Sequence, residues 1–136
     1  MAKENGLGWT TCSIDDSAGT LRAIINDVTN LQFALPRGVQ DWTGIDKSAI
    51  ERGLLLADFS ATLNYVFNDA ASTGAHTVLK TVSSTSVTRT FSLAVSGQTL
   101  SNEVIASDLQ YARAQSGEFT ATVPLALADG TVPTWS

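Results

Sequence analysis

The segment from Ala57 to Asn68 constrains the fold of this chain most strongly, because apolar and aromatic side chains alternate in it with mainly polar ones. Successive side chains of a β-strand point to opposite faces of a sheet. One face of this segment would carry Ala57, Phe59, Ala61, Leu63, Tyr65 and Phe67, and the other Asp58, Ser60, Thr62, Asn64, Val66 and Asn68. The alternation predicts a long strand that buries its first face and exposes its second face to water.

Further strands are expected on both sides of this segment. Short runs rich in apolar and β-branched residues, bounded by turn residues, predict them at 21–25, 28–35, 76–82, 87–95, 100–106 and 118–127. Residues 107–111 either continue the preceding strand or bend away. Pro124 places the last strand at a sheet edge or at a strand end, because proline cannot donate to a ladder. These strands together predict a mostly antiparallel β-sandwich.

One short helix is predicted from residue 47 to about residue 52. Asp46 is placed to cap its first turn, and Gly53 offers a stop. Ser48 with Glu51 could form a competing capping box one turn later.

The length of 136 residues fits a single domain, 1–136. Residues 1–20 are polar, contain glycine and have little periodicity, so we expect an N-terminal arm or loop there. Residues 37–44 are expected to form a loop, and residues 131–136 a C-terminal tail.

Charged residues make up only 15% of the chain, against roughly 25% in ordinary domains, while 43% are apolar. A monomer could cover its surface with Ser and Thr in place of charged residues. A subunit covered by neighbours also needs few charges, since interface cores are depleted in charge. Composition therefore favours self-assembly. The net charge of -5 and the absence of a Lys/Arg cluster argue against stable nucleic-acid binding.

Catalytic, metal and cofactor sites are not expected. His76 is the sole histidine and Cys12 the sole cysteine, so neither a positioned base nor a zinc ligand set is evident. The carboxylates Asp15, Asp16 and Asp58 follow no calcium-loop pattern. The longest apolar stretch is too short for a membrane span, and the first residues do not resemble a secretion signal.

Three tryptophans, Trp9, Trp42 and Trp135, lie outside the predicted strands. Such rings pack at the edge of a domain or at contacts between chains. They could cover the domain internally, anchor arms onto neighbouring subunits, or stack against sugars.

Four segments resemble the major tail (tail tube) protein of long-tailed, non-contractile bacteriophages, in the short version of actinobacteriophages. They are Val28-Thr-Asn-Leu-Gln-Phe33, Thr43-Gly-Ile-Asp-Lys-Ser-Ala-Ile-Glu-Arg52, Leu56-Ala-Asp-Phe-Ser-Ala-Thr-Leu-Asn64 and Leu127-Ala-Asp-Gly-Thr-Val-Pro133. The chain departs from the family at Tyr65, where a small residue is expected.

The resemblance implies a structural virion protein and no enzyme. Copies would form stacked, hexameric rings whose strands join one multi-subunit β-barrel, through which genomic double-stranded DNA passes transiently from capsid to host. Other partners would be tape measure and tail tip or terminator proteins, with assembly in the host cytoplasm and final location in the virion tail. On this reading Asp58, Ser60, Thr62 and Asn64 face the lumen, and ring or stacking contacts fall on Trp9, Arg37, Trp42, Asp46 and Trp135.

Two alternatives stay open. A capsid decoration or head-completion protein also requires a small, charge-poor β-sandwich, and it would form trimeric clusters rather than tubes. A soluble carbohydrate-binding β-sandwich would stay monomeric and use its tryptophans for sugar stacking.

Overall fold

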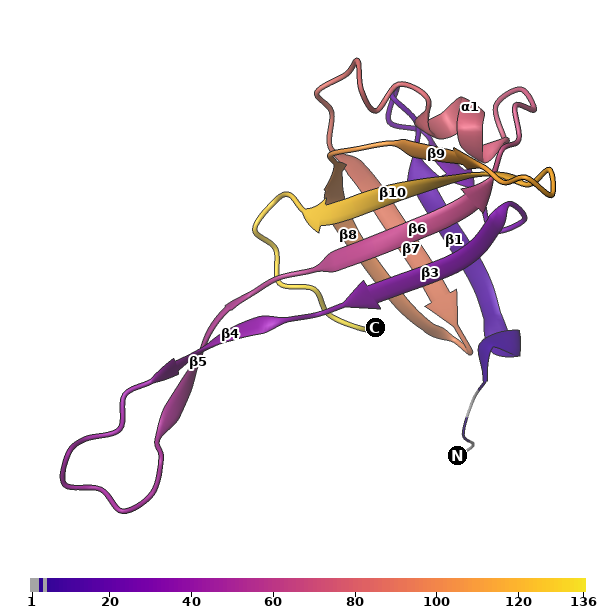
Figure 1. Cartoon of the computed structure of the whole chain (residues 1–136). Coiled ribbons are helices and arrows are strands. Elements are labelled where there is room, and N and C mark those ends of the chain that lie inside the picture. Colours follow the sequence, from indigo (N-terminus) through magenta and orange to yellow (C-terminus); the bar gives the residue numbers. More distant parts are fainter. Residues whose placement is uncertain (1–2, 4) are drawn as a thin grey trace.

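The computed structural model describes residue 3 and residues 5–136, and it consists mainly of β-strands (Figure 1). Its elements are η1 (Gly6–Gly8), β1 (Trp9–Asp15), β2 (Leu21–Ala23), β3 (Val28–Ala34), β4 (Arg37–Asp41), β5 (Arg52–Ala57), β6 (Ser60–Val66), α1 (Ala75–Leu79), β7 (Arg89–Val95), β8 (Gln98–Ala106), β9 (Gln110–Arg113) and β10 (Phe119–Leu127). The predicted mainly β fold with one short helix is confirmed. None of the helices in these residues has the length and apolarity to cross a membrane.

Eight strands form one folded-over antiparallel sheet in the order β2-β1-β7-β8-β10-β6-β3, with β9 also beside β10. β8 pairs with β10 only over residues 104–106, and β9 pairs with β10 further along that strand. The strands β2, β1, β7 and β8 therefore cross behind the layer β9-β10-β6-β3 (Figure 1). The predicted antiparallel sandwich is confirmed.

The core lies between these two layers. Leu63 and Tyr65 of β6 are fully buried, as are Phe91 and Leu93 of β7. Phe59 bridges the layers, with its ring centroid 6.3 Å from that of Phe91. Burying a side chain of this size contributes about 1.5–3 kcal/mol, so this apolar face holds the layers together. The Tyr65 ring points into this core.

The alternation predicted for residues 57–68 is present, but the segment is not one strand. β5 ends at Ala57 and β6 begins at Ser60. Between them the amide of Asp58 donates to the oxygen of Pro36, and the Asp58 carboxylate accepts from the amide of Phe59. β6 lies in the sandwich, whereas β5 leaves it and pairs with β4 in an arm that extends from the body (Figure 1).

The helix predicted at residues 47–52 and the loop predicted at 37–44 are both wrong. Residues 37–41 form β4, residues 52–57 form β5, and a loop joins the two strands. Thr43 ties the loop ends together, because its hydroxyl accepts from the amide of Glu51 at 2.7 Å. Pairing with β4 satisfies the backbone hydrogen-bonding groups from residue 52 onward. A helix cap at Asp46 would satisfy only the first turn of a helix, so the strand pairing prevails.

The strand predicted at residues 76–82 is also wrong, because the helix α1 lies there. Gly74 at its N-cap offers no side-chain oxygen, but the amide of Ala75 donates to the carboxylate of Asp27 at 2.9 Å. Val78 and Leu79 pack into the core. The capping oxygen comes from 48 positions earlier in the chain, so local sequence gave no signal for this helix.

The arm or loop expected at residues 1–20 is wrong at residues 9–15. Residues 9–15 form β1, which pairs with β7 on one side and β2 on the other. Cys12 and Ile14 of this strand are buried in the core. Residues 1, 2 and 4 lie outside the described residues.

Pro124 lies in the middle of β10 and not at an edge or a strand end, so that prediction is wrong. Its register partner is Thr62 of β6 on one side. On the other side, β10 pairs with β9 up to Thr122 and with β8 from Leu125 onward. Pro124 therefore lies where β10 changes from β9 to β8 as its partner. No strand of the described residues pairs with Pro124 on that side, so its missing amide hydrogen is tolerated.

Candidate assembly surfaces

The layer β9-β10-β6-β3 has an edge strand on each side, β9 and β3, among the described residues. Each strand of the layer is antiparallel to its neighbour, so β9 and β3 run in opposite directions. β3 reads Val-Thr-Asn-Leu-Gln-Phe-Ala and contains neither proline nor charge, two of the devices that prevent an edge strand from pairing. The β3 edge is therefore suited to accept another strand.

The outward face of β3, β6 and β10 is polar but uncharged. Because Ala61, Leu63 and Tyr65 point into the core, the intervening positions of β6 point outward. The register aligns these positions with outward positions of the neighbouring strands, in the rows Asn30-Asn64-Thr122, Gln32-Thr62-Pro124 and Ala34-Ser60-Ala126. The Thr122 hydroxyl hydrogen bonds to Asn64 Oδ1 at 2.6 Å.

The four residues predicted to face a lumen do not all lie on this sheet face. Ser60, Thr62 and Asn64 share it, whereas Asp58 precedes β6 at the base of the arm. Asp58 is exposed. Three of the four are thus brought together, and the charged one lies at their border.

The arm is held by a small set of polar contacts. Arg37 at its base donates twice to the backbone oxygen of Leu55, at 3.0 and 2.7 Å. At its far end, the Asp41 carboxylate accepts from the hydroxyl and the amide of Thr43, at 2.6 and 3.0 Å. These bonds, the hydroxyl bond first, hold the pKa of Asp41 below its usual value of 3.8.

Large apolar side chains cover the arm and are exposed to solvent. The set is Leu35, Val39, Trp42, Ile45, Ile50, Leu54, Leu55 and Leu56. A two-stranded hairpin on its own is at best marginally stable in water, and an apolar surface of this kind marks a contact site. The Trp42 ring lies so close over Gly53 that a Cβ atom there would overlap it.

The five predicted contact residues fall into two groups. Arg37, Trp42 and Asp46 lie on the arm or its loop. Trp9 and Trp135 lie on the body, where both rings pack against Phe33, with centroids at 6.4 and 6.1 Å. The internal-cover reading therefore fits Trp9, the exposed Trp42 fits the contact reading, and Trp135, which packs on Phe33 but is also exposed, fits both.

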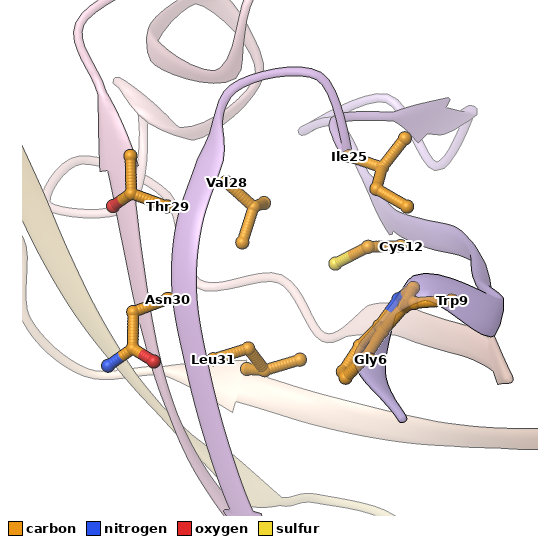
Figure 2. A pocket seen from close by; sticks show the side chains of 8 residues that line it. All are labelled: Gly6, Trp9, Cys12, Ile25, Val28, Thr29, Asn30 and Leu31. Atoms are coloured by element: carbon orange, nitrogen blue, oxygen red, sulfur yellow. The ribbon is translucent and has the colours of Figure 1, made fainter. Parts of the chain in front are cut away.

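A cavity of about 440 Å³ opens between β1 and β3, on the inner side of the β3 edge (Figure 2). It is lined by Gly6, Trp9, Cys12, Ile25, Val28, Thr29, Asn30 and Leu31. Burial raises the pKa of Cys12 to about 12, so its thiol stays protonated and unreactive near neutral pH.

His76 takes part in an aromatic cluster with Phe67 and Tyr111. Its ring stacks on Phe67 with centroids 4.2 Å apart, and Nδ1 lies 3.3 Å from the hydroxyl of Tyr111. Among residue 3 and residues 5–136, no group of three or more His, Cys, Asp or Glu side chains is placed to hold a metal ion.

Sequence reasoning missed two features of these surfaces. β4 begins directly after Pro36, where the sequence predicts a loop, because Arg-Gly-Val-Gln-Asp contains one apolar side chain and no alternation. The uncharged rows could have been found by noting that β3, β6 and β10 share a lack of charge, but only the register shows that these strands are neighbours.

No protein-family model and no curated protein matches this chain. Several solved structures do match in fold. A chain in the virion of the native gene transfer agent (GTA) particle has a TM-score of 0.74 and 15% identity, covering 98% of this chain and 99% of that chain. A chain in the tail of the empty GTA particle, solved with C6 symmetry, has a TM-score of 0.74 and 17% identity, with 98% of each chain covered. The SPP1 tail tube gives a TM-score of 0.77 at 8% identity, covering 98% of this chain and 79% of that chain. This chain therefore has a fold found in tail assemblies of phage-like particles.

Proposed function

We propose that this chain is a structural subunit of a virion tail tube, of the kind found in long-tailed, non-contractile phages such as actinobacteriophages, and that it has no enzymatic role. Copies would join edge to edge in rings of six, the symmetry with which the similar tail of the empty GTA particle was solved. The fold similarity and the four sequence segments support this proposal.

The observation that carries the proposal is the pair of edge strands on one four-strand layer. Because β9 and β3 run in opposite directions, rotating a copy about an axis brings its β9 beside the β3 of its neighbour in an antiparallel pairing. Six copies of this layer would close a barrel of about 24 strands, and barrels of that size enclose an open, hydrated lumen. Closure also removes the unprotected β3 edge.

The arm would supply the contact between rings. It extends away from the sandwich (Figure 1), and its apolar side chains have no cover within the described residues. An interface between unlike surfaces gives a filament when its repeat does not close into a ring, and contacts along the ring axis do not close. On the arm, Arg37, Trp42 and Asp46 are the proposed contact residues, and Trp9 and Trp135 are proposed to contribute from the body.

In the assembled tube, Ser60, Thr62 and Asn64 would face the lumen, with Asp58 at their border. Genomic double-stranded DNA would pass transiently along this surface from capsid to host. Tape measure and tail tip or terminator proteins would be the other partners, with assembly in the host cytoplasm and residence in the virion tail.

Electron microscopy of the purified chain at rising concentration tests this function. We expect hollow filaments of regular diameter. The double variant Ile45→Ser, Leu56→Ser removes two highly exposed apolar side chains from the arm and should leave a folded protein that forms no filaments. Leu7→Ser is the matched control, since Leu7 is equally exposed but lies outside the arm. Monomers at every concentration, or trimeric clusters, would contradict the proposal.

A further inference from the structure

The three strands β3, β6 and β10 contain no charged residue, and they are neighbours in the sheet. Each other strand of the described residues contains at least one charge: Asp15 in β1, Arg22 in β2, Arg37 and Asp41 in β4, Arg52 in β5, Arg89 in β7, Glu103 in β8 and Arg113 in β9. The net charge of -5 is therefore carried elsewhere on the molecule.

The nearest charges lie beyond the ends of these strands. Asp58 precedes β6, whereas Arg113 and Glu118 lie near its other end, where β9 and β10 meet. The seven residues of β6 span about 20 Å from first to last at about 3.3 Å per residue, so Leu63 at its centre lies about 10 Å from either end. This distance exceeds the Debye length of about 8 Å at physiological salt, so the middle of the face is screened from those charges.

The face is nevertheless polar. Hydroxyl and amide side chains occupy most of its outward positions, and one row reaches all four strands of the layer through Asn30, Asn64, Thr122 and Gln110. Thr122 and Asn64 are already hydrogen bonded to each other. Such groups hold water at the surface without adding a charge.

We propose that this face forms a wetted, electrically neutral wall along which a polyanion passes without being held or repelled. The proposal rests on the tube function above and specifies the electrostatic interaction between the wall and the polyanion that passes along it. Lysines on the wall would bind phosphates through the release of counterions, and carboxylates would oppose entry of the same phosphates. Neutral hydroxyl and amide groups exchange hydrogen bonds with water instead, so passage along the wall should depend little on salt.

The reactivity of a thiol placed on the face measures the local potential directly. In assembled filaments of Thr62→Cys, we compare the reaction rates of a cationic and an anionic methanethiosulfonate reagent. The native Cys12 is buried and stays silent. At physiological salt, the ratio of the two rates should stay within about twofold of the ratio for 2-mercaptoethanol, because the face adds no potential of its own and the charges beyond its ends are screened.

The variant Ser60→Asp, Thr62→Cys is the matched control. Ser60 lies two positions away on the same face, so its new carboxylate should raise the preference for the cationic reagent about fivefold over that of Thr62→Cys at the same physiological salt. A preference of that size in Thr62→Cys itself would overturn the neutral wall while leaving the filaments, and hence the tube function, intact. An unchanged ratio in the control would overturn the placement of the face on an enclosed wall. If no filaments form, the tube function fails, and the ratio measured on the dispersed chain still reports whether the face is neutral.

Discussion

The guanidinium of Arg89 lies 2.8 Å from the backbone oxygen of Asp15 and joins the first strand of the sandwich to the helix α1. The same nitrogen, Nη1, donates to the oxygen of Val78 at 3.1 Å, and Nη2 donates to the hydroxyl of Thr81. The side chain is almost completely buried. Burial lowers the pKa of Arg89, but the group remains charged at any pH at which the protein is studied.

Replacing Arg89 with methionine keeps an unbranched side chain but removes all three hydrogen bonds. Buried carbonyl groups then lose their donor, so we expect Arg89→Met to lower the free energy of unfolding by about 2–3 kcal/mol, measured by urea denaturation of the unassembled chain. Arg22→Met is the control. Its ion pair with Asp16 is partly exposed, so its loss should cost at most about 1 kcal/mol. Equal losses in the two variants would contradict the role assigned to Arg89.

Asp27 is expected to control the order of α1. Its carboxylate accepts from the amide of Ala75 and from Nδ2 of Asn68, both at 2.9 Å. Asp27→Ala should therefore speed hydrogen exchange of the amides in residues 75–80 about fivefold or more, since a lost cap costs about 1 kcal/mol or more. Asp69→Ala, at an exposed position of the connection between β6 and α1, should leave this exchange unchanged. Equal exchange in both variants would show that α1 does not depend on Asp27.

Gly53 is expected to tolerate no side chain. A Cβ atom at this position would overlap the Trp42 ring, whereas at Gly6 it would meet no atom within 4 Å. In a Trp9→Phe, Trp135→Phe background, Gly53→Ala should displace Trp42 and shift its fluorescence emission to longer wavelength. Gly6→Ala should leave the spectrum unchanged. An unshifted spectrum for Gly53→Ala would mean that Trp42 does not pack on this glycine.

The end of the arm is expected to loosen in acid. Because the pKa of Asp41 is lowered below 3.8 in the folded arm, its bonds to Thr43 contribute stability above pH 3.8, and that contribution is lost as the pH falls through the lowered pKa. The fluorescence of Trp42, in the same background, should report this change. Asp41→Asn should remove that step from the titration, and Asp129→Asn, far along the chain, should retain it. A step that survives in Asp41→Asn would assign it to another group.

The sequence predicted the body of the fold better than its connections. The alternation of Ala61, Leu63 and Tyr65 sufficed to place β6 and its buried face, because period-2 patterning follows directly from a half-buried strand. The outward set Ser60, Thr62 and Asn64 followed from the same pattern.

The errors arose where long-range contacts outweigh local signals. The Asp46 and Gly53 pattern suggests a helix, but pairing between β4 and β5 prevails there. For α1, the cap comes from Asp27, far away in sequence. The polar N-terminal region gave little periodicity, yet β1 is held between two partners. In each case the decisive partner lies on another strand, which a reading of neighbouring residues cannot detect.

The arm is also a mechanical extension of the sheet. β4 follows β3 across Leu35 and Pro36, β5 precedes β6 across Asp58 and Phe59, and the Asp58 amide bonds to the Pro36 oxygen at the junction. Tension applied to the tip along this direction would pull β3 and β6 together and load the ladder between β6 and β10 in shear, since ladder hydrogen bonds lie perpendicular to the strands. All of these bonds would then resist together instead of opening one by one, so a pull on the arm would be borne by the sandwich as a whole.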